Sequence, residues 1–239
     1  AVKGYKRKRE AITLPFLYKF LIHFFPLGDS VNAQNAPTIT AQILKNIAII
    51  SICVILYCKG NKQIFEDVKD SRTVEYDLDI LERQIQDKDM VLISNCNFCR
   101  PIIGLAKKYN KPLAVNVRSM RKERMVQKED FLKAADILYI SDDELDKEPY
   151  ECINECRTKY NQKIIIVGIG SKGVILYTRE DNSILEYKPV KTNEIVNTVG
   201  AGNAMFSAFL HYYVKTGDAH DAIKNALLFA SYKIGFLGT

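Results

Sequence analysis

Apolar residues in this chain fall into short runs that alternate with amphipathic stretches from residue 47 to the end. Short apolar runs predict buried strands, and apolar residues spaced three or four apart predict helices. The predicted strands are 90–94, 113–116, 137–140, 163–167, 174–178 and 183–187, and the predicted helices are 78–86, 101–109, 128–134, 150–160, 200–215 and 219–234. This alternation predicts an α/β fold with a mostly parallel sheet covered by helices on both faces. Ligands should then bind at loops after the carboxyl ends of the strands.

The first 46 residues give the weakest pattern, with one helix expected within 12–25 and another over 38–46. Residues 47–58 and 63–68 flank a Lys-Gly-Asn-Lys turn, which predicts a hairpin, and 73–76 predict a further short strand. We therefore divide the chain into a poorly readable segment, 1–46, and an α/β domain, 47–239.

The amino-terminal segment has the outline of a secretory signal, because a basic start, 3–9, precedes an apolar stretch, 12–27. Prolines and charged or polar residues interrupt that stretch: Pro15, Lys19, His23 and Pro26. The apolar run 47–58 is too short to cross a bilayer. We expect no membrane-spanning helix, and we interpret the basic start as a solvated tail rather than as an RNA or membrane contact.

Composition adds mild constraints. A chain of 239 residues with 47% hydrophobic residues is long enough for one medium domain with a real core. The net charge of +6 favours anionic ligands such as nucleotides, but it does not by itself indicate nucleic-acid binding. Six cysteines without a disulfide-scaffold spacing predict a cytoplasmic protein. Cys96 and Cys99 form a CxxC pair, but the three histidines are scattered, so ordinary thiols are favoured over zinc ligands.

Residues 196–206, VNTVGAGNAMF, form the most informative stretch. Gly200 and Gly202 flank Ala201 where a helix is predicted to begin, so the backbone can approach a ligand closely. The unpaired amides and the positive end of the helix dipole favour an anion such as phosphate. Asn203 lies beside them in the first turn.

Two weaker motifs precede this stretch. Residues 168–173, GIGSKG, follow a strand and precede a hairpin rather than a helix, so a dinucleotide-binding turn is disfavoured. Ser141 and Glu144 have the spacing of a helix capping box. The same residues could cap a helix and also bind a ligand. Lys172 and Arg118 are candidates for phosphate contacts.

Together these motifs resemble the ribokinase-like (PfkB-type) carbohydrate kinases, whose signature reads Asp-Thr-x-Gly-Ala-Gly-Asp-x-Phe. The resemblance implies a ribokinase-like fold in which a small β lid, here reduced to strands within 47–76, covers the sugar. It implies that Gly200, Ala201 and Gly202 form an anion hole and that Asn203 occupies the catalytic base position. It further implies an ATP site and a Mg²⁺ ion held through water by Glu144; the residues expected at the ATP site are Gly168, Gly170, Lys172, Gly173, Asn197 and Thr198.

The chain departs from the family pattern at several of these positions. Asn203 replaces the catalytic Asp, and Ser141 replaces the Asn of the family's Asn-x-x-Glu motif. Gly168 replaces a threonine, and Asn197 replaces the first Asp of the signature. The family's sugar-binding opening has no clear counterpart, so no substrate residues are assigned.

The resemblance implies an ATP-dependent phosphotransferase that acts on a hydroxyl of a small sugar or nucleoside, with turnover impaired at Asn203. The alternative is a non-catalytic relative that binds the same ligands. A deliberate substitution that traps substrate is a third account, but the departures at 141 and 168 favour natural divergence. We expect no nucleic-acid or membrane partner, and a homodimer is left open.

Overall fold

The computed structural model describes residues 11–13, 52–58, 61–67, 78–117, 120, 128–142, 145–191 and 195–236. The described strands form one seven-stranded sheet and one two-stranded sheet. The large sheet has the order β1 (Ala11–Thr13), β4 (Met90–Ser94), β5 (Leu113–Val117), β6 (Ile137–Ser141), β7 (Ile164–Gly168), β8 (Val174–Thr178) and β9 (Ser183–Tyr187). In this sheet β1, β4, β5, β6 and β7 pair in parallel, and β8 and β9 are added antiparallel. The predicted α/β fold with a mostly parallel sheet is confirmed.

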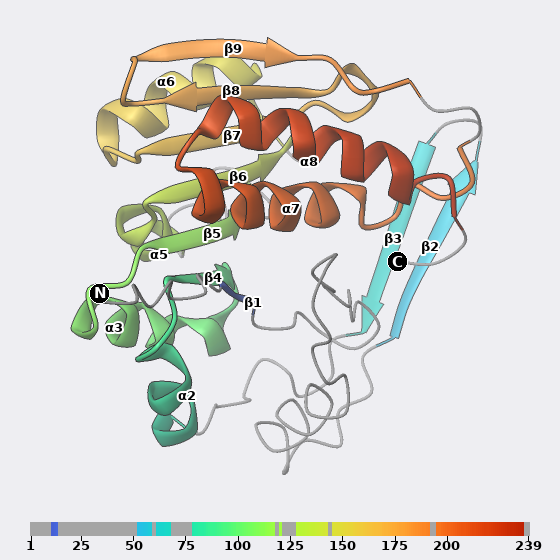
Figure 1. Ribbon diagram of the computed structural model, residues 1–239. Coiled ribbons are helices and arrows are strands. Elements are labelled where there is room, and N and C mark those ends of the chain that lie inside the picture. The colour runs from blue at the N-terminus through green and yellow to red at the C-terminus, as the bar shows by residue number, and fades with distance from the viewer. Residues whose placement is uncertain are drawn as a thin grey trace, which may run out of the picture.

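Helices cover both faces of this sheet, as the continuous apolar strands predict. One face packs against α2 (Leu78–Ile85), α3 (Arg100–Lys108), α5 (Glu129–Ala134) and α6 (Pro149–Lys159). The other face packs against α7 (Ala201–Thr216) and α8 (Ala219–Lys233), which lie side by side across it (Figure 1).

Alternation along each strand divides the core into two layers. In β6, Leu138 and Ile140 face the α2, α3, α5 and α6 side, whereas Ile137 and Tyr139 face α7 and α8. Burying a large apolar side chain contributes about 1.5–3 kcal/mol, so the fully buried Phe206 and Phe209 anchor α7 firmly. The first turn of α7 is thereby fixed at the carboxyl edge of the sheet.

The predicted hairpin is also present, as β2 (Ile52–Cys58) and β3 (Asn61–Asp67). It forms a sheet of its own, outside the large sheet (Figure 1). Its role as a lid stays a prediction, as does the boundary at residue 46.

Strand β1 is the one described strand that the sequence did not predict. Only three residues long, it pairs in parallel with β4. A run this short carries no measurable periodicity. Three further predictions lie outside the described residues. They are the remainder of the segment expected to hold a helix within 12–25, the helix over 38–46 and the strand at 73–76.

Candidate active site

The candidate site lies where parallel strands β5, β6 and β7 reach their carboxyl ends. The sheet register places Asn116 of β5 opposite Tyr139, and Ser141 of β6 opposite Gly168 of β7. Such an edge is where ligands bind in open α/β sheets. The first turn of α7 meets this edge, because the Asn116 side-chain amide donates a hydrogen bond to Oδ1 of Asn203 at 2.9 Å.

Helix α7 begins with exposed backbone donors. Gly200 is the N-cap residue in a left-handed conformation (φ 77°), and no side chain caps the helix. Ala201 N–H donates to the Thr198 carbonyl at 3.2 Å, and Ala204 N–H donates to the Gly200 carbonyl at 2.9 Å. Within the described residues, the amides of Gly202 and Asn203 have no hydrogen-bond acceptor. Two donors at the positive end of a 16-residue helix are suited to a phosphate group.

The residues before this turn are held by the end of α8. The Ile234 carbonyl accepts the amides of Val196 and Asn197 at 2.8 and 3.0 Å. The Asn197 side chain folds back, and its Oδ1 accepts the Val199 amide at 2.9 Å. Asn197 was predicted to contact the cofactor, and the structure shows that its side-chain oxygen shapes the turn.

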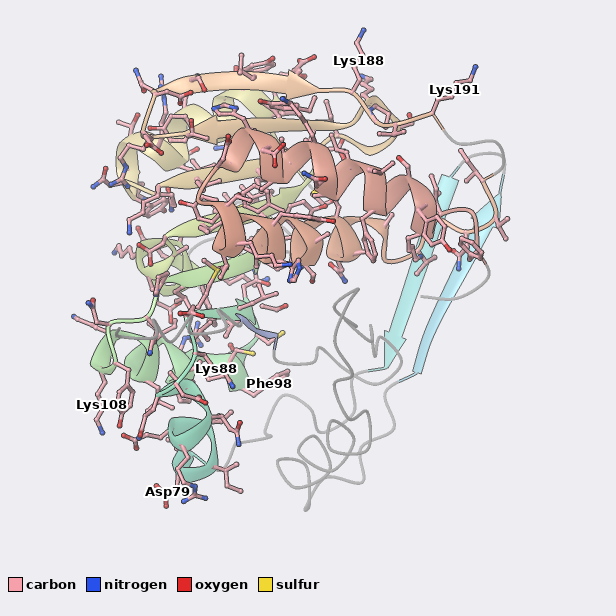
Figure 2. The ribbon with its side chains drawn as sticks, in the orientation of Figure 1. Asp79, Lys88, Phe98, Lys108, Lys188 and Lys191 are labelled. Carbon is pink, nitrogen blue, oxygen red and sulfur yellow. The ribbon has the colours of Figure 1, made fainter. Side chains whose placement is uncertain are left out.

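The glycine-rich turn from Gly168 to Gly173 lies beyond the end of β7. A short 3₁₀ turn, η5 (Gly170–Lys172), occupies its centre, and Gly170 and Gly173 have φ of 59° and 110°. A Cβ on Gly173 would stand 2.1 Å from the Tyr187 carbonyl oxygen, so only glycine fits there. The Lys172 side chain is exposed at the rim. Lys188 and Lys191, after β9, extend away from the sheet (Figure 2).

Tyr139 lies between the two glycine-containing turns, and no sequence motif identified it as a site residue. The ring is 5% exposed and stacks on Phe206 of α7 at a centroid distance of 5.1 Å. A Cβ added to Gly168 would stand 2.8 Å from the Tyr139 hydroxyl, and one added to Gly202 would stand 2.3 Å from it. Gly168 and Gly202 are therefore glycines because a buried phenol fills the space beside both.

The structure brings only part of the predicted phosphate and metal set together. Ser141 ends β6 and Asp142 follows it, both half-buried. Glu144 and Arg118, and with Glu144 the capping box, lie outside the described residues. No cluster of three or more His, Cys, Asp or Glu side chains in the described part of the chain is arranged to hold a metal ion.

The CxxC cysteines lie elsewhere, between β4 and α3. Among the described residues, Cys96 and Cys99 form no disulfide, and burial raises the pKa of Cys99 to about 12. A thiol with such a pKa stays protonated at neutral pH and is a poor metal ligand.

Asn116 is the contact that sequence reasoning missed as a site residue. It ends a run of apolar residues, and a polar residue at the carboxyl end of a predicted parallel strand is the signal that could have found it.

Comparison with known proteins decides the family. Residues 60–239 match the model of the pfkB family carbohydrate kinases. The chain belongs to this family. The chain is 40% identical over 75 residues to a deoxyribokinase of Salmonella typhi, covering 31% of this chain and 24% of that protein. It is 24% identical over 190 residues to ribokinase of Dictyostelium discoideum, covering 69% and 59%.

Solved structures confirm the ribokinase-like fold of this pfkB-family chain. A microbiome-derived acarbose kinase, Mak1, superposes with a TM-score of 0.67 at 20% identity over 78% of this chain and 63% of that one. Ribokinase of Arabidopsis thaliana complexed with ribose and ATP gives 0.59 at 20% identity over 78% and 64%. The pfkB-family chain spans less than two thirds of each relative named here. Among its described helices, none has the length and apolar character needed to cross a bilayer.

Proposed function

We propose that this chain binds ATP at the Gly200–Asn203 helix start and transfers a phosphoryl group to a hydroxyl of a small sugar or nucleoside. The observation that carries the proposal is the pair of free amides, of Gly202 and Asn203, at the carboxyl edge of the sheet. Membership of a carbohydrate-kinase family, and the relatives named ribokinase and deoxyribokinase, support a pentose-type acceptor.

In this proposal the backbone supplies most of the catalysis. Phosphoryl transfer depends largely on positioning and on stabilising the phosphate oxygens, which fixed amide donors can do. The glycine-rich turn, 168–173, and Lys172 line the other side of the nucleotide. Mg²⁺ would be held through water by Asp142 and Glu144, since oxygen ligands suit this ion. Bound there, it would neutralise phosphate charge.

The base position sets the rate. A general base contributes about 10²–10⁴-fold, and a neutral amide does not accept the substrate proton. Asn203 is exposed, and its oxygen already accepts a hydrogen bond from Asn116. Asn203 can still orient a substrate hydroxyl, so we expect substrate binding with slow turnover.

The Asn203→Asp variant tests this assignment. A carboxylate at this position keeps the hydrogen bond from Asn116 and can accept the proton, so turnover should rise by about 10²-fold or more. ATP affinity should change much less, because backbone amides carry that binding. The measurement is product formation with ATP and a panel of sugars and nucleosides, alongside ATP titration.

Asn203→Ala is the matched control, since it removes the amide without adding a base and should not gain activity. Unchanged turnover of Asn203→Asp despite intact ATP binding would contradict the kinase proposal.

That outcome would favour the second candidate function, a non-catalytic nucleotide- and sugar-binding protein. The specific observation in its favour is the neutral Asn116–Asn203 pair where the family has a carboxylate. A cytoplasmic location and a homodimer stay predictions.

A further inference from the structure

The ammonium group of Lys233 lies behind the proposed phosphate-binding turn. Lys233 is in the last turn of α8, and its Nζ donates a hydrogen bond to the carbonyl oxygen of Val199, the residue before Gly200. The next residue, Ile234, accepts the Val196 and Asn197 amides with its carbonyl. The end of α8 therefore holds the turn through both a side chain and the backbone.

The Val199 carbonyl is the group that a preceding helical turn would use to accept the Asn203 amide, four residues on. Asn203 is the third residue of α7, so its amide is one of the donors that any helix start leaves without an intrahelical acceptor. Lys233 in turn holds the Val199 carbonyl. The lysine therefore fixes the carbonyl that precedes Gly200 and places a positive charge behind the turn.

Within the described part of the chain, the charge of Lys233 also has no counterion. The side chain is half-buried, and burial lowers the pKa of Lys233. No carboxylate of the described residues forms an ion pair with it. A partly buried ammonium without a counterion is costly unless an anion offsets it. A phosphate bound at the amides of Gly202 and Asn203 would be that anion. One turn of backbone would separate it from the Lys233 ammonium.

We propose that Lys233 is a positioning residue for the triphosphate of the nucleotide, which fixes the Val199 carbonyl and adds positive potential behind the Gly200–Asn203 turn. The inference rests on the proposed function, because it needs a phosphate at that turn. It differs from a purely structural role of Lys233 in one respect. A structural residue affects every ligand alike, whereas this one acts only on the phosphates.

The experiment compares ATP with adenosine, which lacks phosphates, by calorimetric titration and by ligand-induced shifts in melting temperature. The variant Lys233→Met keeps the length of the side chain and removes the charge. We expect its ATP affinity to fall by about tenfold, the usual scale for a lost charged hydrogen bond, with adenosine binding unchanged. Lys233→Arg should retain most of the ATP affinity.

Lys224→Met is the matched control, because it removes one positive charge from an exposed position of the same helix and should leave ATP affinity unchanged. If Lys233→Met does not fold, Lys233→Gln compared with Lys233→Arg gives the same test. Equal ATP affinities for wild type and the neutral variants, or parallel losses for ATP and adenosine, would overturn the inference alone. Absence of ATP binding by the wild-type chain would overturn the proposed function, and this inference with it.

Discussion

The buried hydroxyl of Tyr139 accounts for the glycine at position 168, where the chain departs from the family pattern. Family resemblance predicts a threonine at position 168, and a side chain there would collide with this hydroxyl. The two residues lie 29 positions apart in the chain and meet only through the pairing of β6 with β7. The Tyr139 hydroxyl thus fills the space that a side chain at position 168 would need, which explains the glycine there.

Gly168→Ala should therefore destabilise the protein by about 1–3 kcal/mol, the usual cost of overpacking a core. In a Tyr139→Phe background the nearest atoms to the new Cβ are ring carbons at 3.4 Å, so most of that cost should disappear. Urea denaturation of the two single variants and the double variant measures this coupling.

Gly104→Ala provides the control, because no atom lies within 4 Å of its added Cβ and a helical alanine is favoured over glycine by about 0.5–1 kcal/mol. A Gly168→Ala cost that is the same in both backgrounds would disprove the role of the Tyr139 hydroxyl.

The predicted site residues divide by the kind of signal that found them. Gly200, Gly202 and Asn203 belong to one local motif, and the structure places them together at a helix start. Asn116, Tyr139 and Lys233 were missed as site residues, because each reaches the site through tertiary contacts that no local pattern encodes.

At the level of elements, α7 and α8 form a tight antiparallel pair. Gly217 ends α7 in a left-handed conformation (φ 75°), and Asp218 begins α8 by accepting the amides of His220 and Asp221 at 2.8 and 3.0 Å. These amides also lower the pKa of Asp218. The start of α7 and Lys233 of α8 lie at the same end of this pair. The packing of the two helices therefore determines the geometry of the candidate site.

Removing the cap should weaken this pair. Asp218→Ala leaves two amides at the start of α8 without an acceptor and should cost about 0.5–2 kcal/mol of stability, whereas Asp218→Asn should retain most of it. Thermal unfolding followed by circular dichroism measures the difference. Equal melting temperatures for the alanine variant and the wild type would show that the cap is dispensable.

The remaining elements were predictable because their patterns are long and their ends are marked. Strands β4, β8 and β9 begin and end at the predicted residues, and described helices from α2 onward agree within two residues at each end. Asn110, in a left-handed conformation (φ 49°), follows the C-cap residue Tyr109 of α3. Strand β1 was missed because its identity depends entirely on its partner β4.

Across the whole molecule, a hydrogen-bonded network ties the β8–β9 hairpin to α8. His220 Nε2 lies 2.8 Å from Asp181 Oδ2, and His220 Nδ1 lies 2.6 Å from the Tyr187 hydroxyl. Hydrogen bonds from Thr178, and then from His220 and Ser183, lower the pKa of Asp181. The network joins the antiparallel edge of the sheet to the helix layer.

This network predicts how stability depends on acid. The folded-state pKa of Asp181 is below its unfolded value of about 3.9. The stability that Asp181 contributes is therefore fully present above pH of about 4 and is lost as the pH falls from there through the folded-state pKa. Asp181→Asn should therefore flatten the fall in unfolding free energy below pH of about 4. Urea denaturation at a series of pH values tests this, and an unchanged slope for Asp181→Asn would contradict it.

The order of the strands has a consequence for how the protein is made. From β4 to β9, spatial order in the sheet follows order along the chain, so each strand emerging from the ribosome can pair with the one before it. The proposed phosphate-binding turn is different, because Lys233 and Ile234 at the carboxyl end of α8 hold it in place. A nascent chain stalled before α8 would hold an almost finished sheet in which the part of one apolar face that α8 covers is still open. The turn proposed to bind phosphate should therefore take its final form late in synthesis, after the sheet that supports it.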